Sequence, residues 1–322
     1  MEKNKIKIVF FGTPEFATAS LDRLVTEGRN DGIVVAAVVT MPDKTAGRGH
    51  GLIESDVKKY AKEHDIRVLQ PSNLKAPEFI EELKEINADL FVVIAFRMLP
   101  EAVWSMPPKG TFNLHASLLP KYRGAAPINR AVMNGEKETG ITTFFLKHEI
   151  DTGDIIDQEK IEIKPEENAG DVHDKLMELG AALTLKTVKE IAAGKVKSYP
   201  QPEGEFIPAP KIFKDTCKID WNHPSEKIHN QIRGLAPYPS AWAIFTDHRT
   251  GDKQNDIKIF ESALTDEFNH ENGEPGTVMI EKDRLLVKTG DSWIEIKSVR
   301  PAGKKMMEAA AFLRGYRPSK FM

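Results

Sequence analysis

The chain has 322 residues, of which 40% are hydrophobic and 29% are charged, a composition that fits a soluble globular protein of two domains. Its formal net charge of −3 excludes a protein that is basic throughout, and its apolar runs fall short of the roughly 20 residues that a membrane span needs. The single cysteine, Cys217, excludes an intrachain disulfide and a cysteine cluster for zinc.

Apolar runs alternate with helical patterns through the first half of the chain. We predict strands at 6–11, 33–39, 66–69, 89–95 and 110–115, and helices at 16–25, 54–63 and 77–86. Continuous apolar strands separated by helices are typical of a parallel sheet that is covered on both faces. Ligands bind beyond the carboxyl ends of the strands in such sheets, which here predicts a site near Gly12, Thr40, Ala95 and His115.

The turn after the first strand, residues 11–15, lacks the G-x-G-x-x-G pattern of dinucleotide binding. Its absence disfavours a nicotinamide enzyme.

The second half of the chain changes character after a long helix that we predict at 172–193. Residues 195–210 contain four prolines and several charges, as in an extended linker. A helix at 225–235 and five strands follow, with hairpin turns expected at Gln254-Asn255 and Gly290-Asp291. The five strands are predicted at 241–246, 257–262, 276–281, 285–289 and 293–298.

These patterns predict an α/β protein. We expect a Rossmann-like, doubly wound, mostly parallel sheet domain at 1–193, and a basic Pro-rich linker at 194–210. A small C-terminal β-barrel of the OB type would follow at 211–322.

The charge is unevenly distributed along the chain. Residues 186–218 hold seven lysines against four acidic residues, a local net charge of +3, and residues 300–322 reach +5. Such segments can gather a polyanion, or they are the solvated lysines of a linker and a tail. We expect a cytoplasmic protein, because the charged N-terminus has no signal-peptide pattern.

A polar pair, Asn113 and His115, falls at the carboxyl end of the predicted strand 110–115. Residues two apart in a strand point to the same face. Buried polar groups need partners, so a pair placed here would be costly if it served the structure alone. The pair therefore predicts a functional site, although a lone histidine is more often a satisfied core residue.

Asp151 lies in a second polar stretch, where Gly153 permits a tight turn between two strand-like runs. An aspartate in a turn usually hydrogen-bonds to its own backbone. Alternatively, Asp151 reaches His115 and fixes its tautomer. The sequence leaves both readings open.

Asn113, His115 and Asp151 together suit acyl transfer to an amine. The Asn113 amide and a protonated His115 would stabilise the oxyanion that develops on the carbonyl, and a neutral His115 would take the proton of the attacking amine. No serine or cysteine nucleophile is needed, and G-x-S-x-G is absent. His223 and His229 match no common zinc spacing, so we expect no metal.

The stretch 113–127 resembles the signature of the 10-formyltetrahydrofolate-dependent formyltransferases. It reads Asn-Leu-His-Ala-Ser-Leu-Leu-Pro and continues through Tyr-Arg-Gly and Ala-Pro. The turn 151–153 resembles the catalytic aspartate loop of that family, and residues 10–16 resemble its first strand and turn. The resemblance covers nearly the whole chain, although Arg97 stands where the family usually has a glycine.

This resemblance implies roles for the polar residues above. Asn113 and His115 would act on the formyl carbonyl of 10-formyltetrahydrofolate, with Asp151 supporting His115 and no metal involved. The folate site would be lined by Ser117, Leu118, Leu119 and Pro120.

Members of that family act on glycinamide ribonucleotide, on UDP-linked amino sugars or on methionyl-tRNA, and three features favour methionyl initiator tRNA here. Segment 42–49, with Arg48, resembles the loop by which the tRNA enzymes enter the acceptor arm. The linker and the C-terminal barrel match the two-domain plan of those enzymes. The turn 301–305 resembles a basic turn near their C-terminus, which implies tRNA contacts at Lys304 and Lys305. The product would be formylmethionyl-tRNA for translation initiation.

Two alternatives stay open. A formyltransferase of UDP-linked amino sugars would not require the Arg48 loop or the basic tail. A non-catalytic tRNA or folate binder would not need Asn113, His115 and Asp151 together. From the resemblance we also predict a monomer.

Overall fold

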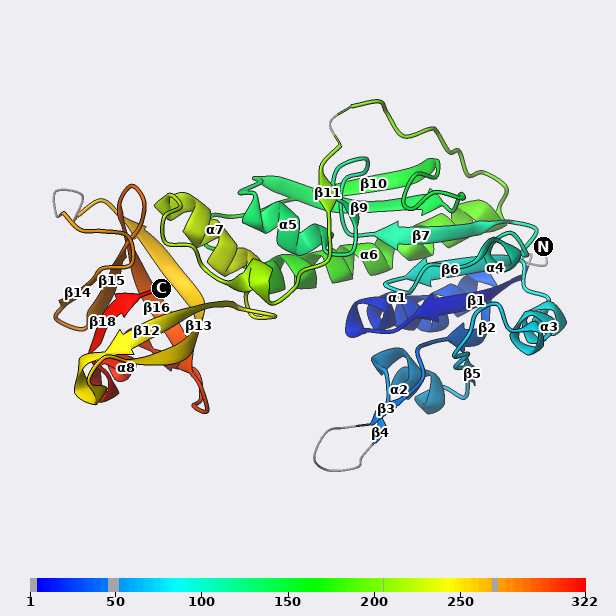
Figure 1. Cartoon of the computed structure of the whole chain (residues 1–322). Helices are drawn as coiled ribbons and strands as arrows, with labels where there is room; N and C mark the ends of the chain where they lie inside the picture. Colours follow the sequence, from blue (N-terminus) through cyan, green and yellow to red (C-terminus); the bar gives the residue numbers. More distant parts are fainter. Residues whose placement is uncertain (1–4, 46–51, 205, 268–271) are drawn as a thin grey trace. The chain divides into compact units, whose positions relative to one another are not determined.

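The computed structural model describes residues 5–45, 52–204, 206–267 and 272–322 (Figure 1). Its contacts divide the chain into two compact units. The first unit comprises residues 1–124, 139–161 and 173–208, and the second comprises residues 125–138, 162–172 and 209–322. Over the described ranges, no helix has both the length and the apolar character to cross a membrane.

The first unit is built on a seven-stranded sheet with the order β10-β9-β7-β6-β1-β2-β5 (Figure 1). The pairs β1–β2, β1–β6, β2–β5 and β6–β7 are parallel, and β7–β9 is antiparallel. The strands are β1 (Ile6–Gly12), β2 (Ile33–Val39), β5 (Arg67–Leu69), β6 (Leu90–Ile94), β7 (Thr111–His115), β9 (Glu138–Phe145) and β10 (Ile155–Glu162).

The other helices and short strands up to residue 209 follow in chain order, and α5 among them belongs to the second unit. They are α1 (Glu15–Thr26), η1 (Gly28–Asp31), β3 (Lys44–Thr45), β4 (Leu52–Ile53), α2 (Asp56–Glu63), α3 (Pro77–Ile86), α4 (Glu101–Trp104), β8 (Arg123–Gly124), α5 (Pro127–Met133), α6 (Ala169–Ala192) and β11 (Pro208–Ala209).

Both faces of the parallel sheet are buried, as the continuous apolar strands predict. On one face, Val9 and Phe11 of β1 join a core with Phe79 and Leu83 of α3. On the other face, a side chain added at Gly180 of α6 would lie 2.8 Å from Leu114 of β7, so helix and strand are in close contact. Burying one such Phe or Leu stabilises the fold by about 1.5–3 kcal/mol. The predicted parallel sheet is confirmed. The two strand-like runs that flank Gly153 form β9 and β10, and the antiparallel pairing of β9 with β7 was not predicted.

The second unit contains a seven-stranded antiparallel sheet that is nearly closed into a barrel. The strand order is β14-β15-β16-β13-β12-β18, with β17 paired to β16. A bridge between Thr277 and Lys320 brings the two edges together, and the Phe321 N–H donates to Gly276 O at 2.8 Å. The predicted C-terminal β-barrel is therefore confirmed.

Helix α7 precedes the barrel strands and lies at the residues that we predict for it. From residue 215 onward the elements are η2 (Asp215–Cys217), α7 (Ser225–Leu235), β12 (Ala241–Asp247), η3 (His248–Thr250), β13 (Lys253–Thr265), β14 (Val278–Glu281), β15 (Arg284–Lys288), β16 (Trp293–Pro301), β17 (Met307–Glu308), α8 (Ala309–Gly315) and β18 (Pro318–Phe321).

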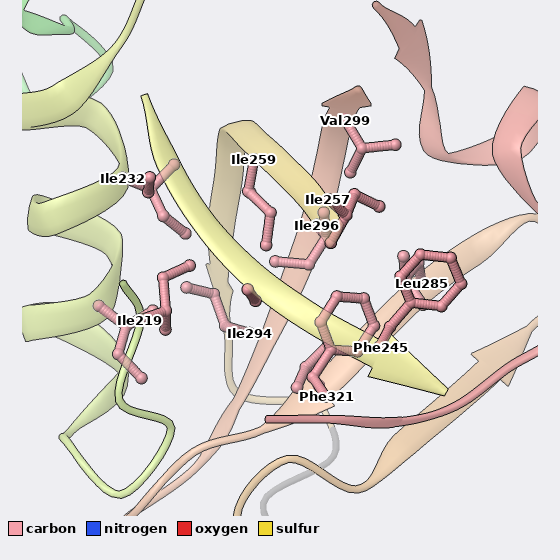
Figure 2. Close-up of a cluster of buried hydrophobic side chains, with 14 of the residues drawn as sticks. Ile219, Ile232, Phe245, Ile257, Ile259, Leu285, Ile294, Ile296, Val299 and Phe321 are labelled. Atoms are coloured by element: carbon pink, nitrogen blue, oxygen red, sulfur yellow. The ribbon is translucent and has the colours of Figure 1, made fainter. Parts of the chain in front are cut away.

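The barrel interior is filled by alternate residues of the strands. Buried and half-buried positions alternate strictly along β12, which places Phe245 inside. Phe245 meets Leu285, Ile296 and Phe321 in a core that Figure 2 shows, with Ile232 of α7 closing one side. All residues of this core belong to the second unit.

One of the two predicted hairpin turns is wrong. Gln254 and Asn255 lie inside β13, paired with Thr246 and Phe245. The chain reverses earlier, through η3 and Gly251, which has a φ of 70° that glycine adopts without strain. The other predicted turn is confirmed, because Gly290 and Asp291 join β15 to β16.

Candidate active site

His115 ends strand β7, at the carboxyl edge of the parallel sheet. Its side chain is buried, with 7% of the residue exposed. The ring Nε2 lies 2.8 Å from the carbonyl oxygen of Tyr122. A carbonyl only accepts, so Nε2 carries a hydrogen and donates it. Nδ1 is therefore the nitrogen that remains available to take or give a proton.

Asp151 faces this available nitrogen. Its Oδ2 lies 3.9 Å from His115 Nδ1, which is an ion-pair distance and too long for a hydrogen bond. The same oxygen accepts the N–H of Gly124 at 3.0 Å. Asp151 has a φ of 55°, in the left-handed region where aspartate is tolerated better than most residues. The backbone thus turns to direct this carboxylate toward the histidine.

Asn113 lies two residues before His115 on β7 and is half-buried. Strand alternation places the two side chains on the same face. Among the described residues, no side-chain hydrogen bond occupies the Asn113 amide. The amide is therefore available to donate to a ligand. Strand β7 thus carries Asn113 beside His115, and Asp151 lies near the His115 ring, which is one of the two positions that the sequence leaves open.

The Asp151 loop is fixed by contacts that the sequence did not reveal. Gln201 donates through its Nε2 to Asp151 O at 2.7 Å and to Gly153 O at 2.9 Å. Its Oε1 accepts two hydrogen bonds from the guanidinium of Arg123. Gln201 lies 50 residues beyond Asp151, in a Pro-rich stretch whose composition predicts only a linker.

Gly153 gives this loop its close approach to strand β9. A Cβ at this position would lie 1.5 Å from the carbonyl oxygen of Phe145. Only a glycine fits, so the turn predicted at Gly153 depends on the close approach of two backbone segments and not on a left-handed conformation.

The segment Ser117–Pro120 uses its polar groups internally. The Ser117 hydroxyl is fully buried and donates to Lys121 O at 2.7 Å. The Leu119 N–H donates to Thr142 Oγ1 at 3.2 Å, and Gln158 Nε2 donates to Leu119 O at 3.0 Å. What this segment leaves for a ligand is the partly exposed surface of Leu118 and Pro120.

Two buried polar atoms lack a hydrogen-bond partner at the carboxyl ends of the neighbouring strands β1 and β6. Among the described residues at this edge, these atoms are Thr13 Oγ1 and Arg97 Nε. The two terminal nitrogens of Arg97 donate to the carbonyls of Ser72 and Pro71, and burial lowers the pKa of its guanidinium. Beside it, Met98 is 72% exposed. An apolar surface with unsatisfied donors fits a flat heteroaromatic ring that carries polar atoms at its rim.

The predicted tRNA-contacting residues lie elsewhere. Arg48 falls outside the described residues. Lys304 and Lys305 are exposed in the turn between β16 and β17 of the second unit, where Lys304 N–H donates to Pro301 O at 3.0 Å. Within the part of the chain that is described, no group of three or more His, Cys, Asp and Glu side chains is placed to hold a metal ion.

Comparison with known proteins identifies the family of this chain. The N-terminal formyl transferase family matches residues 5–188, and the formyl transferase C-terminal domain matches residues 211–317. A methionyl-tRNA formyltransferase of Bacteroides fragilis is 51% identical over 98% of this chain and 97% of its own length. One of Phocaeicola vulgatus is 53% identical over 99% of this chain and 98% of its own. The chain belongs to the formyl transferase family.

Two solved structures share the fold of this chain. The N-formyltransferase of Helicobacter canadensis, in complex with folinic acid and dTDP-3-aminofucose, has a TM-score of 0.63 and 24% identity. The match covers 90% of this chain and 98% of that one. HypX of Aquifex aeolicus, in complex with tetrahydrofolic acid, has a TM-score of 0.61 and 17% identity, covering 96% of this chain and 47% of that one. At these identities the likeness concerns the fold alone.

Proposed function

We propose that this chain transfers the formyl group of 10-formyltetrahydrofolate to the amino group of methionine on initiator tRNA. It would act as a monomer in the cytoplasm and supply formylmethionyl-tRNA for translation initiation. The observation that carries the proposal is an identity of about one half, over almost the entire length, to relatives named methionyl-tRNA formyltransferase.

The arrangement around His115 supports the proposed chemistry. As the amine attacks the formyl carbon, negative charge develops on the formyl oxygen, and the free amide of Asn113 is placed on the strand face to donate to it. His115 Nδ1 takes the proton that the amine loses, since Nε2 is occupied by Tyr122. The Asp151 carboxylate at 3.9 Å then stabilises the charged ring.

Folate binding is proposed at the carboxyl edge of β1 and β6, continuing to the segment Ser117–Pro120. Thr13 Oγ1 and Arg97 Nε are the donors still unsatisfied there, and Met98 and Leu118 offer apolar surface. When bound, 10-formyltetrahydrofolate would supply the formyl carbon. As the bond from that carbon to the folate nitrogen breaks, His115 would pass the proton taken from the amine to that nitrogen, and tetrahydrofolate would leave.

Transfer RNA is a polyanion, so its binding needs cations outside the catalytic residues. We propose Arg48, Lys304 and Lys305 for this role. The net charge of +5 over residues 300–322 supports it, because that segment contrasts with an otherwise acidic chain. The C-terminal barrel would then be the domain that binds tRNA.

The decisive experiment measures formyl transfer from 10-formyltetrahydrofolate to three acceptors, at two salt concentrations. The acceptors are methionyl initiator tRNA, methionyl elongator tRNA and a UDP-linked amino sugar. We expect fast, salt-sensitive formylation of the initiator tRNA. Transfer to the sugar alone would overturn the choice of acceptor and leave the formyl chemistry in place.

The variant His115→Ala separates an enzyme from a binder. We expect turnover to fall at least about a hundredfold, the usual contribution of a general base, while folate and tRNA still bind. Unchanged turnover would remove His115 from the mechanism.

A further inference from the structure

One short segment, residues 122–124, holds both His115 and Asp151. The carbonyl oxygen of Tyr122 accepts a hydrogen bond from His115 Nε2 at 2.8 Å, and the N–H of Gly124 donates to Asp151 Oδ2 at 3.0 Å. These two contacts come from adjacent peptide groups of the chain. A shift of this segment would therefore displace the histidine and the carboxylate together.

The backbone of this segment has a conformation that its surroundings impose. Tyr122 is 3% exposed and has a φ of 61°, in the left-handed region that a bulky residue rarely adopts. Such a conformation persists only where neighbouring structure enforces it. The neighbour here is the Pro-rich stretch 195–210, because Tyr122 N–H donates to Ile207 O at 2.6 Å and β8 pairs with β11. This stretch thus shapes the segment that holds His115 and Asp151.

The Arg123 side chain makes a second link from this segment to Asp151. Its Nε donates to Gln201 Oε1 at 3.1 Å, and its Nη2 donates to the same oxygen. Gln201 continues the link through Nε2, which donates to Asp151 O at 2.7 Å and to Gly153 O at 2.9 Å. Asp151 is therefore held at its carboxylate by Gly124, and at its backbone by Arg123 through Gln201.

The positive charge of Arg123 decides which way the Gln201 amide is turned. An amide turned the other way would bring its oxygen against the carbonyl oxygens of Asp151 and Gly153, and its NH2 group against the guanidinium. The guanidinium also lies over the ring of Phe206, with Cζ 5.7 Å from the ring centroid. A charge-assisted hydrogen bond is about twice as strong as a neutral one, so Arg123 holds Gln201 more firmly than a neutral side chain would.

We infer that Arg123 is a positioning residue for formyl transfer, which acts on Asp151 through Gln201. In the proposed reaction the amine proton moves to His115 Nδ1, and the carboxylate 3.9 Å away stabilises the resulting charge. That stabilisation needs no rearrangement only if the carboxylate is already in place. The role of Arg123 rests on the proposed function, since it concerns the step that Asp151 supports. The Pro-rich stretch is then part of the active site as well as a connector.

The test is a double-mutant cycle of Arg123→Met and Asp151→Asn in the full chain, with formyl transfer to methionyl initiator tRNA as the assay. We expect Arg123→Met to lower kcat about tenfold, and to change the KM of either substrate less than about twofold. Arg123→Lys should recover part of the loss, because an ammonium group still donates to Gln201 Oε1. In the Asp151→Asn background, Arg123→Met should lower kcat by less than about twofold, since the charge that it positions is already absent.

Arg130→Met is the matched control. Arg130 is also half-buried, and its Nε donates to Pro210 O at 3.3 Å, at the end of the same Pro-rich stretch. Its contact is with the stretch itself and not with the Asp151 loop. We expect this control to keep the kcat and both KM values of the unaltered chain.

The outcomes separate the two proposals. If the unaltered chain does not formylate methionyl-tRNA, the proposed function is overturned, and the role of Arg123 with it. If it does, a normal kcat for Arg123→Met overturns the role of Arg123 alone, as does a raised KM with unchanged kcat, which would mean direct contact with a substrate. Equal losses of kcat in both backgrounds would also overturn it, because they would be independent of Asp151. Chemical denaturation identifies any variant that has lost its fold, and Arg123→Lys, with an expected loss of about threefold, then replaces Arg123→Met in the cycle.

Discussion

The replacement of Gly153 by alanine tests whether the Asp151 loop must lie where the structure places it. The new Cβ would lie 1.5 Å from Phe145 O, 2.8 Å from the carbonyl carbon of Phe145 and 3.1 Å from Phe144 Cδ2. Ordinary contact begins at 3.4 Å. Two of these neighbours are backbone atoms of β9, which cannot swing away, so the loop must retreat by about 2 Å, the gap between the forced and the ordinary contact.

That retreat would act on both stability and catalysis. It breaks the Phe145 N–H to Asp154 O bond of 3.0 Å and the Gln201 bond to Gly153 O of 2.9 Å. At about 1 kcal/mol for each net hydrogen bond, the free energy of unfolding should fall by about 2 kcal/mol. Displacing a catalytic group by 1 Å costs about a hundredfold in rate, so kcat should fall at least that far, provided that Asp151 has its proposed role.

The assay is formyl transfer to methionyl-tRNA at saturating substrates, together with chemical denaturation of the same samples. Gly204→Ala is the matched control, because a Cβ there meets no atom within 4 Å. We expect this control to behave like the unaltered chain. A Gly153→Ala variant with normal kcat would refute the reasoning, since it would mean that the position of Asp151 does not matter.

Three further predictions concern the loop, the basic turn and a buried histidine. Gln201→Leu keeps a similar side-chain volume and removes two hydrogen bonds to the Asp151 loop. We expect kcat to fall about tenfold and the free energy of unfolding to fall by about 2 kcal/mol. Unchanged kinetics would mean that the loop keeps its position without Gln201. The double change Lys304→Ala and Lys305→Ala should weaken tRNA binding and reduce the slope of log affinity against log salt by about 2, one for each phosphate contact, and an unaltered slope would remove both lysines from the interface. Burial, and then the charge of Arg233, lower the pKa of His229 below its usual 6.5. Below about pH 6.5, His229 therefore binds a proton in the unfolded chain but stays neutral in the folded chain. The free energy of unfolding should thus be highest above that pH and should decrease as the pH falls. His229→Gln should flatten this decline in a series of unfolding curves, and equal slopes for both proteins would contradict it.

The sequence predicted those features that depend on local periodicity. The alternation in β7 places Asn113 and His115 on one face, and the apolar run of β1 predicts burial on both faces. The prediction of the turn after β12 failed. Gln254-Asn255 has a turn-like composition, but these residues lie inside β13 and pair with Thr246 and Phe245. The register of a long antiparallel pair is decided by the core side chains on both strands, and no single segment shows it.

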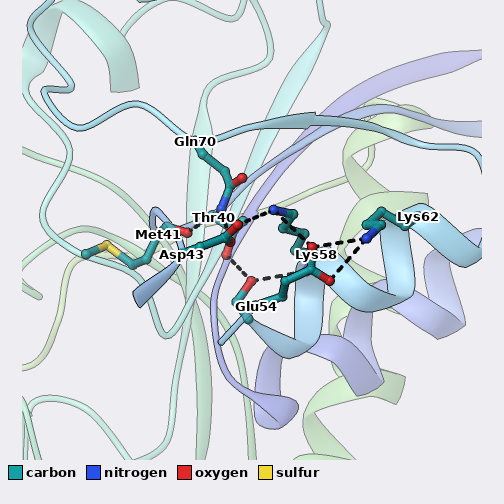
Figure 3. Close-up of polar contacts among 8 residues, drawn as sticks. Thr40, Met41, Asp43, Glu54, Lys58, Lys62 and Gln70 are labelled. Carbon is teal, nitrogen blue, oxygen red and sulfur yellow. Dashed lines mark hydrogen bonds and ion pairs between the residues drawn. The ribbon is translucent and has the colours of Figure 1, made fainter. Parts of the chain in front are cut away.

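The residues that the sequence analysis missed act across long separations. Gln201 contacts a loop 50 residues earlier in the chain, and Lys58 bridges Asp43 and Glu54 from a helix face that otherwise looks solvated (Figure 3). A lysine on a helix and a glutamine in a Pro-rich stretch are common surface residues. Only the fold shows that both have buried or saturated partners.

The orientation of the His115 ring restricts how Asp151 can contribute. Because Nε2 donates to Tyr122 O, the face turned toward Asp151 is the Nδ1 lone pair, and a neutral ring has no hydrogen to give the carboxylate. The contact becomes favourable once Nδ1 is protonated, which in the proposed reaction happens as the amine attacks. The hydrogen bond from the Gly124 N–H and the left-handed backbone at Asp151 already fix the carboxylate in place. It therefore does not need to move when His115 becomes protonated. On this reasoning Asp151 stabilises the state in which charge has moved onto His115, and it contributes little to holding the resting ring, which Tyr122 already fixes.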